Sequence, residues 1–279
     1  MGWIALVAAV MFSFIAQGSW ANVVLFQRVT DTIQLSSPTS LGTAATLEAR
    51  ILHTPAYSGG NVLYREWVDS VTDKNLAVTP SSIAVELHDV APTLSVPAAI
   101  NPNAWHHIAA VYDGASLSLY LDGVRIAAAS ASGSIANGNS RPIFGGGKYE
   151  SYWPIAGFIG YVDWFRMSNV ARYGGATFAP PTSQPASDSN TVLLFYFDEA
   201  PGSTNATDQS SYRNNGTLGA GVSGATQPVF TSDPLAYPSP PPEAAAVPTL
   251  ADTMLMCLAA SLGVAGGLLV RRRLRRTSA

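Results

Sequence analysis

The fold of this chain is indicated by residues 104–129, which read AWHHIAAVYDGASLSLYLDGVRIAAA. Three largely apolar runs in this stretch are separated by Asp113-Gly114 and by Asp122-Gly123. Aspartate and glycine both tolerate the positive φ angles that tight hairpin turns require. The stretch therefore predicts three consecutive antiparallel strands, with an Asp-Gly turn between each pair.

Further short strands are predicted downstream of this meander. Residues 158–167 read FIGYVDWFRM, and residues 191–197 read TVLLFYF, a continuous apolar run typical of a strand buried on both faces. Gly, Pro, Asn and Ser separate the runs, and no amphipathic helical period is evident between residues 22 and 230. We therefore predict an all-β domain over residues 22–230, built as a two-sheet antiparallel sandwich.

These residues resemble the LamG-like jelly-roll family, which has concanavalin A-like topology. The resemblance covers about residues 31–220 and is carried, in the family's order, by WHHIA at 105–109, YDG at 112–114, LYLDG at 119–123, GYVDWFRMSN at 160–169 and NTVLLFYFDE at 190–199. It implies a jelly-roll sandwich. The family contains binding modules, and its wider superfamily contains glycan-cleaving enzymes.

The first 21 residues are predicted to be a signal peptide that forms a short helix. Residues 2–16 are an apolar run, and Ser19 and Ala21 place small residues at the −3 and −1 positions for cleavage before Asn22. The alternative is a buried strand or helix at the start of the domain. We expect export.

A transmembrane helix is predicted at residues 254–270, which carry no charged side chain. Five arginines follow within residues 271–276, so the positive-inside rule places this end in the cytoplasm and the sandwich outside. Residues 231–246 are rich in proline, which favours an extended, semi-rigid linker. Cys257, the single cysteine, lies within the apolar span, so no intramolecular disulfide can form.

Residues 247–276 also resemble the IPTL-CTERM sorting signals of Gram-negative bacteria. The motif residues are Val247, Pro248, Thr249 and Leu250. Valine replaces the usual isoleucine, and ADT at 251–253 stands where the family usually has a Ser-Glu-Trp-like stretch. The resemblance implies an exosortase-like sorting enzyme as a partner and the cell envelope or surface of a Gram-negative bacterium as the location. The helix would then anchor the protein in the membrane either transiently, until the sorting enzyme removes it, or permanently.

The charge distribution argues against nucleic acid as a partner. Five of the 15 basic residues are the terminal arginines, so residues 22–250 carry 10 basic and 17 acidic residues. Such an acidic domain repels phosphate backbones. We predict that the partner is instead an extracellular carbohydrate or an envelope protein.

Carboxylate spacing argues against a glycosidase. Sandwich-fold glucanases carry a Glu-x-Asp-x-x-Glu strand motif, which places acids on one face of the cleft. The sequence has no such motif, and Glu66/Asp69 and Asp198/Glu199 have spacings that put their side chains on opposite faces of a strand. Glu86 and His88 would share a face, which leaves acid/base or metal chemistry as an alternative to a solvated strand face. We predict that the protein is not an enzyme.

A metal site is only weakly indicated. His106 and His107 are neighbours on a predicted strand, so they point to opposite faces and cannot easily share an ion. Some relatives bind calcium at a rim of the sandwich through Asp and carbonyl oxygens. By that resemblance Asp163 is the candidate calcium ligand, although it is equally a strand residue. We predict no cofactor, with calcium as the alternative.

Aromatic residues between two predicted strands are the candidate ligand-binding residues. Tyr149, Tyr152 and Trp153 lie in a loop that follows Gly145-Gly146-Gly147. Exposed rings stack on sugars or anchor protein partners, whereas the alternative is a loop tucked over the sandwich edge. We predict a surface-displayed, non-catalytic recognition or adhesion module. The alternatives are a glycan hydrolase or lyase and a structural matrix component.

Overall fold

The computed structural model describes residues 22–54, 62–67, 73–79, 81–87, 89–98, 100–102, 104–146, 149–150, 153–154, 157–221 and 223–234. These residues belong to a compact unit that ends at Leu235, and a second unit, Ala236–Ala279, lies outside them. The predicted signal peptide, the linker from residue 235 onward and the predicted membrane helix therefore fall outside the described residues. Within the described part of the chain, no helix is long and apolar enough to cross a membrane.

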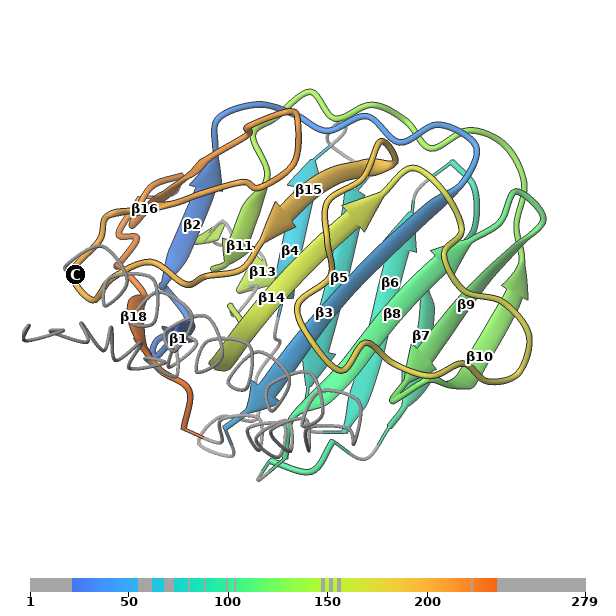
Figure 1. The fold of residues 1–279 in the computed structure, drawn as a ribbon. Coiled ribbons are helices and arrows are strands. Elements are labelled where there is room, and N and C mark those ends of the chain that lie inside the picture. Colours follow the sequence, from blue (N-terminus) through green and yellow to red (C-terminus); the bar gives the residue numbers. More distant parts are fainter. Residues whose placement is uncertain are drawn as a thin grey trace, which may run out of the picture. The chain divides into compact units, whose positions relative to one another are not determined.

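Two antiparallel eight-stranded sheets pack face to face (Figure 1). The first sheet has the order β10-β9-β8-β3-β14-β1-β18, with β15 also paired to β14. Its strands are β1 (Asn22–Phe26), β3 (Ala45–His53), β8 (His106–Tyr112), β9 (Ser116–Leu121), β10 (Val124–Ser130), β14 (Gly160–Ser168), β15 (Thr191–Phe195) and β18 (Val229–Ser232).

The second sheet has the order β16-β17-β2-β11-β4-β5-β6-β7. Its strands are β2 (Thr32–Leu35), β4 (Val62–Trp67), β5 (Asp73–Thr79), β6 (Ser82–Leu87), β7 (Leu94–Pro97), β11 (Ile143–Gly145), β16 (Asn205–Ala206) and β17 (Gly216–Leu218). A separate hairpin contains β12 (Tyr149–Glu150) and β13 (Trp153–Pro154). The predicted all-β two-sheet sandwich of jelly-roll type is confirmed.

The main core lies between the two sheets. Alternate residues of β3 (Leu47, Ala49 and Ile51) face it and are fully buried. From the second sheet, Tyr64 stacks on Phe165 with ring centroids 5.3 Å apart. Burial of these apolar side chains is the main favourable contribution to folding.

The two sheets differ in their burial patterns. In β6, buried and half-exposed residues alternate, as expected when one face of a sheet meets the core and the other meets solvent. In β3 and β8, every residue is buried. The first sheet must therefore be covered on its outer face as well.

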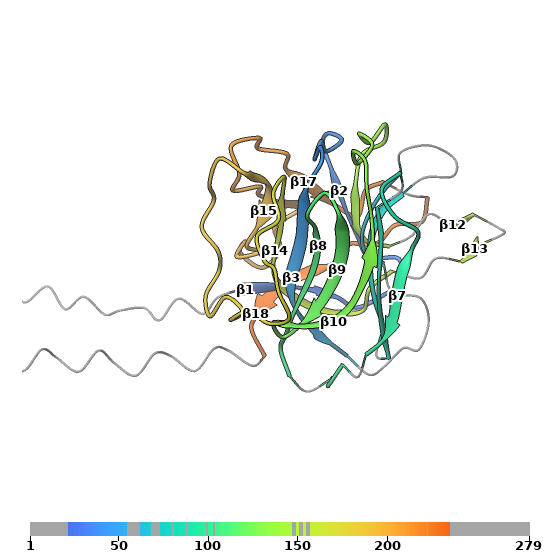
Figure 2. The same ribbon diagram turned by 90° about the vertical axis from the view of Figure 1, so that its right-hand side faces the viewer.

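The cover is the connection between β14 and β15, residues 169–190, which we call the strap. Figure 1 shows it in yellow, running across β3, β8 and β9, and Figure 2 shows it on the outside of the first sheet. Tyr173 and Phe178 of the strap stack on each other with centroids 3.8 Å apart. They pack on a second apolar cluster on this outer face, formed by Ala109, Val111 and Tyr120.

The predicted meander is confirmed, but its two Asp-Gly pairs form different turns. Asp122 and Gly123 have φ angles of 50° and 76°, as expected in a two-residue turn with two positive φ angles. At the first turn only Gly114 has a positive φ, and the loop is one residue longer. There the carboxylate of Asp113 accepts hydrogen bonds from the backbone N–H groups of Ala115 and Ser116, which replaces the second positive φ.

Gly123 is expected to be required because the strap docks against it. The N–H of Phe178 donates to the carbonyl of Gly123 at 2.8 Å, and a Cβ at position 123 would lie 2.1 Å from the carbonyl oxygen of Phe178. Gly175 has a similar φ, +72°, but no atom within 4 Å of its Cβ position. We expect Gly175→Ala to lower the free energy of unfolding by about 1–2 kcal/mol, the cost of the left-handed backbone alone. Gly123→Ala should cost a further ~1–3 kcal/mol through overpacking.

Urea denaturation of the two variants tests this expectation. Equal losses of unfolding free energy for Gly123→Ala and Gly175→Ala would contradict the close docking of the strap on the β9–β10 turn.

Candidate functional site

The predicted aromatic loop forms the hairpin of β12 and β13. Tyr149 pairs with Pro154, and Glu150 pairs with Trp153, while Tyr152 lies outside the described residues. In Figure 2 this hairpin projects from the side of the second sheet, away from the strap. The structure thus places the backbone of two predicted ligand residues beyond the second sheet, and their role in binding stays a prediction.

The base of this loop is tightly closed. A Cβ on Gly157 would lie 2.6 Å from the Cα of Gly146 and 2.7 Å from the carbonyl oxygen of Val29. Hydrogen bonds from Gly146 N to Asp31 O at 2.7 Å and from Phe158 N to Val62 O at 3.1 Å join both ends of the loop to the sandwich. The two glycines therefore fix where the loop leaves the sandwich and where it returns.

Beside this loop, a row of side chains crosses the outer face of the second sheet. Strand register pairs Gln34 with Ile143, Ile143 with Arg65, Arg65 with Asn75, and Asn75 with Glu86. We call these five residues the outer row. Because their strand neighbours Tyr64, Leu76 and Leu87 lie in the core, the side chains of the outer row point away from it.

The outer row carries hydrogen-bonding groups next to an aromatic ring. All its members except Ile143 are half-exposed, and so is Trp67. The guanidinium carbon of Arg65 lies 4.7 Å from the centroid of the Trp67 ring, and Asn75 Nδ2 donates to Glu86 Oε2 at 3.4 Å. Guanidinium, amide and carboxylate groups supply both donors and acceptors, and the indole supplies an apolar surface. Such a surface suits a ligand rich in hydroxyl groups.

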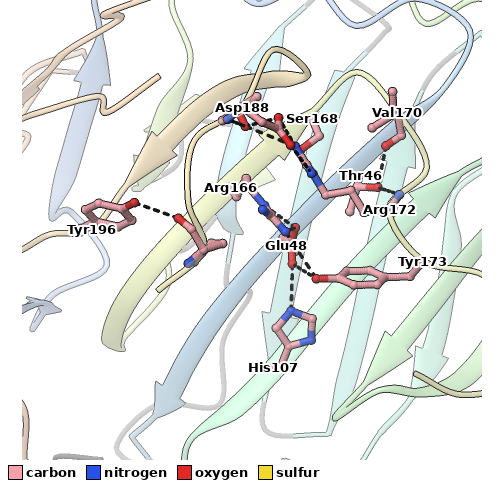
Figure 3. A network of polar contacts seen from close by, with 12 residues as sticks. Thr46, Glu48, His107, Arg166, Ser168, Val170, Arg172, Tyr173, Asp188 and Tyr196 are labelled. Atoms are coloured by element: carbon pink, nitrogen blue, oxygen red, sulfur yellow. Dashed lines mark hydrogen bonds and ion pairs between the residues drawn. The ribbon is translucent and has the colours of Figure 1, made fainter. Parts of the chain in front are cut away.

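A buried polar network lies on the opposite side of the molecule, beneath the strap (Figure 3). Its centre is Glu48, a fully buried residue of β3. The carboxylate of Glu48 forms an ion pair with Arg166 at 2.7 Å and accepts a hydrogen bond from Tyr173 Oη at 2.7 Å. His107 Nε2 lies 3.1 Å from the same carboxylate. The strap thus completes a network whose other members come from β3, β8 and β14.

The pKa of Glu48 reflects this setting. Burial alone would raise the pKa, but the hydrogen bond with His107, the positive charge of Arg166 and the hydrogen bond from Tyr173 outweigh it and lower the pKa below its usual value of 4.5. Burial and the nearby Glu48 charge raise the pKa of Tyr173, so its hydroxyl remains a donor. The Glu48 carboxylate is therefore charged and paired near neutral pH, whereas Nδ1 of His107 is buried without a hydrogen-bond partner among the described residues.

Asp163, the predicted calcium ligand, is buried in a second ion-pair cluster. It is 1% exposed, and its carboxylate accepts hydrogen bonds from Arg50 at 2.8 Å and from Gln184 of the strap at 3.3 Å. Arg50 also lies 3.7 Å from Asp233 and 4.2 Å from the centroid of the Trp105 ring. In the described part of the chain, no three His, Cys, Asp or Glu side chains come together as metal ligands. Calcium binding by Asp163 stays a prediction.

The two neighbouring histidines diverge, as expected on a strand. His107 joins the Glu48 network, whereas His106 Nδ1 lies 2.7 Å from Asp122 Oδ2 in the β9–β10 turn. The hydrogen bond with Asp122 raises the pKa of His106. Both imidazoles are thus held by carboxylates of the sandwich itself.

The described residues include Glu66, Asp198 and Glu199 of the acid pairs considered in the sequence. Glu66 is fully buried and forms an ion pair with Lys74 at 2.8 Å. Asp69 and His88 lie outside the described residues. Asp198 has a pKa of about 6, raised by partial burial and by the charges of Asp163 and Glu199.

Two features were missed by reasoning from sequence. The signal for the buried network was present, because Glu48 and Arg166 are charged residues within strongly apolar strands, where charges are normally paired. The outer row had no comparable signal, since its members lie on five separate strands and are brought together only by strand register.

Comparison with known proteins supports the fold. A family model described as the concanavalin A-like lectin/glucanases superfamily matches residues 27–176. A proposed carbohydrate-binding protein from Bacteroides ovatus has a similar structure, with a TM-score of 0.55 and 16% identity over 76% of this chain and 60% of that protein. Domains LG4-5 of the mouse laminin alpha1 chain align with a TM-score of 0.42 and 16% identity, over 57% of this chain and 47% of theirs.

A third similar structure is smaller. The CBM40 domain of the Ruminococcus gnavus IT-sialidase aligns with a TM-score of 0.40 and 14% identity, over 55% of this chain and 94% of that domain. The chain thus spans less than two thirds of the Bacteroides and mouse proteins. The search of curated proteins found no match.

Removing the Glu48 charge is expected to destabilise the domain strongly. Glu48→Gln leaves the buried guanidinium of Arg166 without its counter-ion, which should cost about 3–5 kcal/mol near neutral pH. Because the folded-state pKa of Glu48 is lowered, its contribution is present above the unfolded-state pKa and is lost as pH falls through the folded value. The difference between the variant and the original protein should therefore shrink as pH falls below 4.5.

Urea denaturation at several pH values measures this difference. Tyr173→Phe is the matched control, since it removes one donor to Glu48 and keeps the stacked ring, and it should cost only about 1 kcal/mol. A loss of stability for Glu48→Gln that does not depend on pH would contradict the charged state of the network.

Proposed function

The chain belongs to the concanavalin A-like lectin/glucanases superfamily, and from that premise we propose that it is an exported, surface-displayed, non-catalytic module that binds carbohydrate. The observation that carries the proposal is the difference between the two outer faces of the sandwich. The strap covers the first, whereas the second is half-exposed and carries the outer row beside Trp67. The ligand surface is the outer face of β11, β4, β5 and β6 together with the adjoining β12–β13 hairpin.

The similar fold of the Bacteroides ovatus protein, itself a proposed carbohydrate-binding protein, agrees with this function. Two of the buried carboxylates also agree with a non-catalytic role. Glu48 and Glu66 are each neutralised by a buried cation, so neither is available as a general acid or nucleophile. Fold alone does not assign activity, so the proposal depends on the chemistry of the exposed face.

The position of the domain's two ends is compatible with display of the domain on the cell surface. Asn22 of β1 pairs with Ser232 of β18, so the chain enters and leaves the sandwich at neighbouring points of the first sheet. In Figure 2, β1 and β18 lie on the side opposite the β12–β13 hairpin. A domain attached to an envelope through its ends would therefore present the second sheet outward.

Binding should be lost when the exposed face is altered. We expect the purified protein to bind members of a glycan array, and Trp67→Ala combined with Arg65→Ala to weaken binding at least ~10-fold, about 1.4 kcal/mol. Replacing Tyr152 and Trp153 with Ala should have a similar effect if the hairpin contributes. Titration calorimetry with and without calcium measures both.

Tyr212→Ala is the control, because Tyr212 is 62% exposed and lies in the connection between β16 and β17 rather than on β11, β4, β5 or β6. Equal affinity of all variants would move the site elsewhere. Absence of binding to any glycan would favour a structural role or a protein partner, and release of reducing sugar would show an enzyme.

The location of the protein in the envelope is tested separately. With a tag after Ala279, protease added to spheroplasts should digest the domain and leave the tag protected. Replacement of Pro248 and Thr249 should abolish processing by the exosortase-like enzyme. An unchanged mature size would instead indicate a permanent membrane anchor through residues 254–270, and digestion of the tag would contradict the orientation.

A further inference from the structure

The core contains an ion pair that the proposed function does not use. The sequence has two lysines, Lys74 and Lys148. Lys74 is directly paired with Glu66 across β4 and β5, and its Nζ lies 2.8 Å from Glu66 Oε2. The two side chains are 1% and 0% exposed. A fully buried Lys–Glu pair is an expensive way to stabilise a fold, because both charges lose their hydration.

The groups around the Glu66 carboxyl are arranged asymmetrically. Oε1 accepts a hydrogen bond from the backbone N–H of Thr39 at 2.7 Å. Oε2 accepts from Tyr64 Oη at 3.0 Å and also from Thr39 Oγ1. Lys74 Nζ in turn donates to the carbonyl oxygen of Thr39 at 2.8 Å and to its Oγ1 at 3.0 Å, which fixes the direction of the amine.

The backbone at Gly138 seals this site. A Cβ at position 138 would lie 1.6 Å from Glu66 Oε1 and 2.2 Å from its carboxyl carbon. Bulk water therefore cannot approach the carboxyl group from this side. In such a setting the uncharged form of an amine gains relative to the charged form.

The titration behaviour of the neighbours agrees with this environment. Burial lowers the pKa of Lys74, although the charge of Glu66 and the hydrogen bond to it act in the opposite direction. Burial, and then the charge of Glu66, raise the pKa of Tyr64 well above its usual value, so its hydroxyl keeps its proton and remains a donor.

We propose that Glu66 and Lys74 condense without added factors into an intramolecular amide cross-link between β4 and β5. The amine nitrogen is held 2.8 Å from Oε2 of the carboxyl group, at the short range that intramolecular reactions require. The N–H of Thr39 stabilises the negative charge that develops on Oε1. Tyr64 Oη donates to Oε2, the oxygen that leaves.

The step balances without an oxidant or a second reactant. One proton moves from Nζ to Oε2, and the neutral amine then adds to Cδ of Glu66. Collapse of the adduct breaks the bond between Cδ and Oε2, and this oxygen leaves as water with two protons that came from Nζ. The product is a secondary amide, which removes two buried charges and costs less to keep in the core than the ion pair did.

Peptide mapping of the full chain tests the proposal. Trypsin cleaves after Arg65 and normally after Lys74. If the amide has formed, the denatured protein should yield a peptide from Glu66 to Arg125 that is uncleaved after Lys74 and lighter than its sequence by the mass of one water. Tandem mass spectrometry should show the loop closed between residues 66 and 74.

Two variants separate the cross-link from simple resistance to trypsin. Lys74→Arg keeps the positive charge but removes the amine, so residues 66–74 should be released as a free peptide of unmodified mass. Glu66→Gln should form the same amide by losing ammonia, and its cross-linked peptide should have the same mass as that of the original protein. The original protein would be purified in its folded state, denatured and digested. Release of the unmodified 66–74 peptide would then overturn the proposal, whether or not the protein binds glycans.

Discussion

The way in which the strap covers the first sheet depends on one carboxylate buried between them. Glu48 is fully buried and has no access to water, so its charge must be compensated by protein groups. Arg166 and His107 supply part of that compensation from neighbouring strands, and Tyr173 supplies the rest from the strap. The strap is therefore held by a specific polar contact as well as by the stacking of Tyr173 and Phe178 on the apolar cluster beneath it.

This arrangement makes the two sheets unequal. With the strap in place, β3 and β8 of the first sheet are buried on both faces, which agrees with their largely apolar sequence. The second sheet keeps the alternation of a half-exposed sheet, and its open face carries groups that can bind hydroxyls. The difference between the two sheets also agrees with the position of the domain's ends, because the first strand, β1, and the last strand, β18, are neighbours in the first sheet. Under the proposed function, the first sheet would face the site of attachment and the second sheet would face the ligand.

The domain reaches this state without disulfides. Two of its buried carboxylates, Glu48 and Glu66, are both paired with cations but differ in surroundings. Glu48 lies under the strap and is shared among three partners from different elements. Glu66 lies in the main core against a single amine and a sealed backbone. The first arrangement organises the docking of a segment, whereas the second brings together two groups that can react with each other.

The sequence by itself determined the fold class, the meander and the strands near residues 158–167 and 191–197. Apolar runs with a period of two and Asp-Gly turns are local properties, and the conformations they favour do not depend on distant residues. The two Asp-Gly pairs needed tertiary information to be told apart. His106 holds Asp122 and the strap holds Gly123, whereas the carboxylate of Asp113 accepts hydrogen bonds within its own loop. The pairing of Asp163 with Arg50 could likewise not be predicted from local sequence, because only the folded chain brings the two side chains together.

The outer row, the strap and the Glu66–Lys74 contact were decided by tertiary structure alone. Gln34, Arg65, Asn75 and Glu86 share a face because of strand register, and register is set by how the whole hydrophobic pattern fits the core. The path of residues 169–190 depends on polar partners that lie more than a hundred positions away in sequence, such as Glu48 for Tyr173. Such long-range pairings leave no periodic signal in the chain, so no local pattern can specify them.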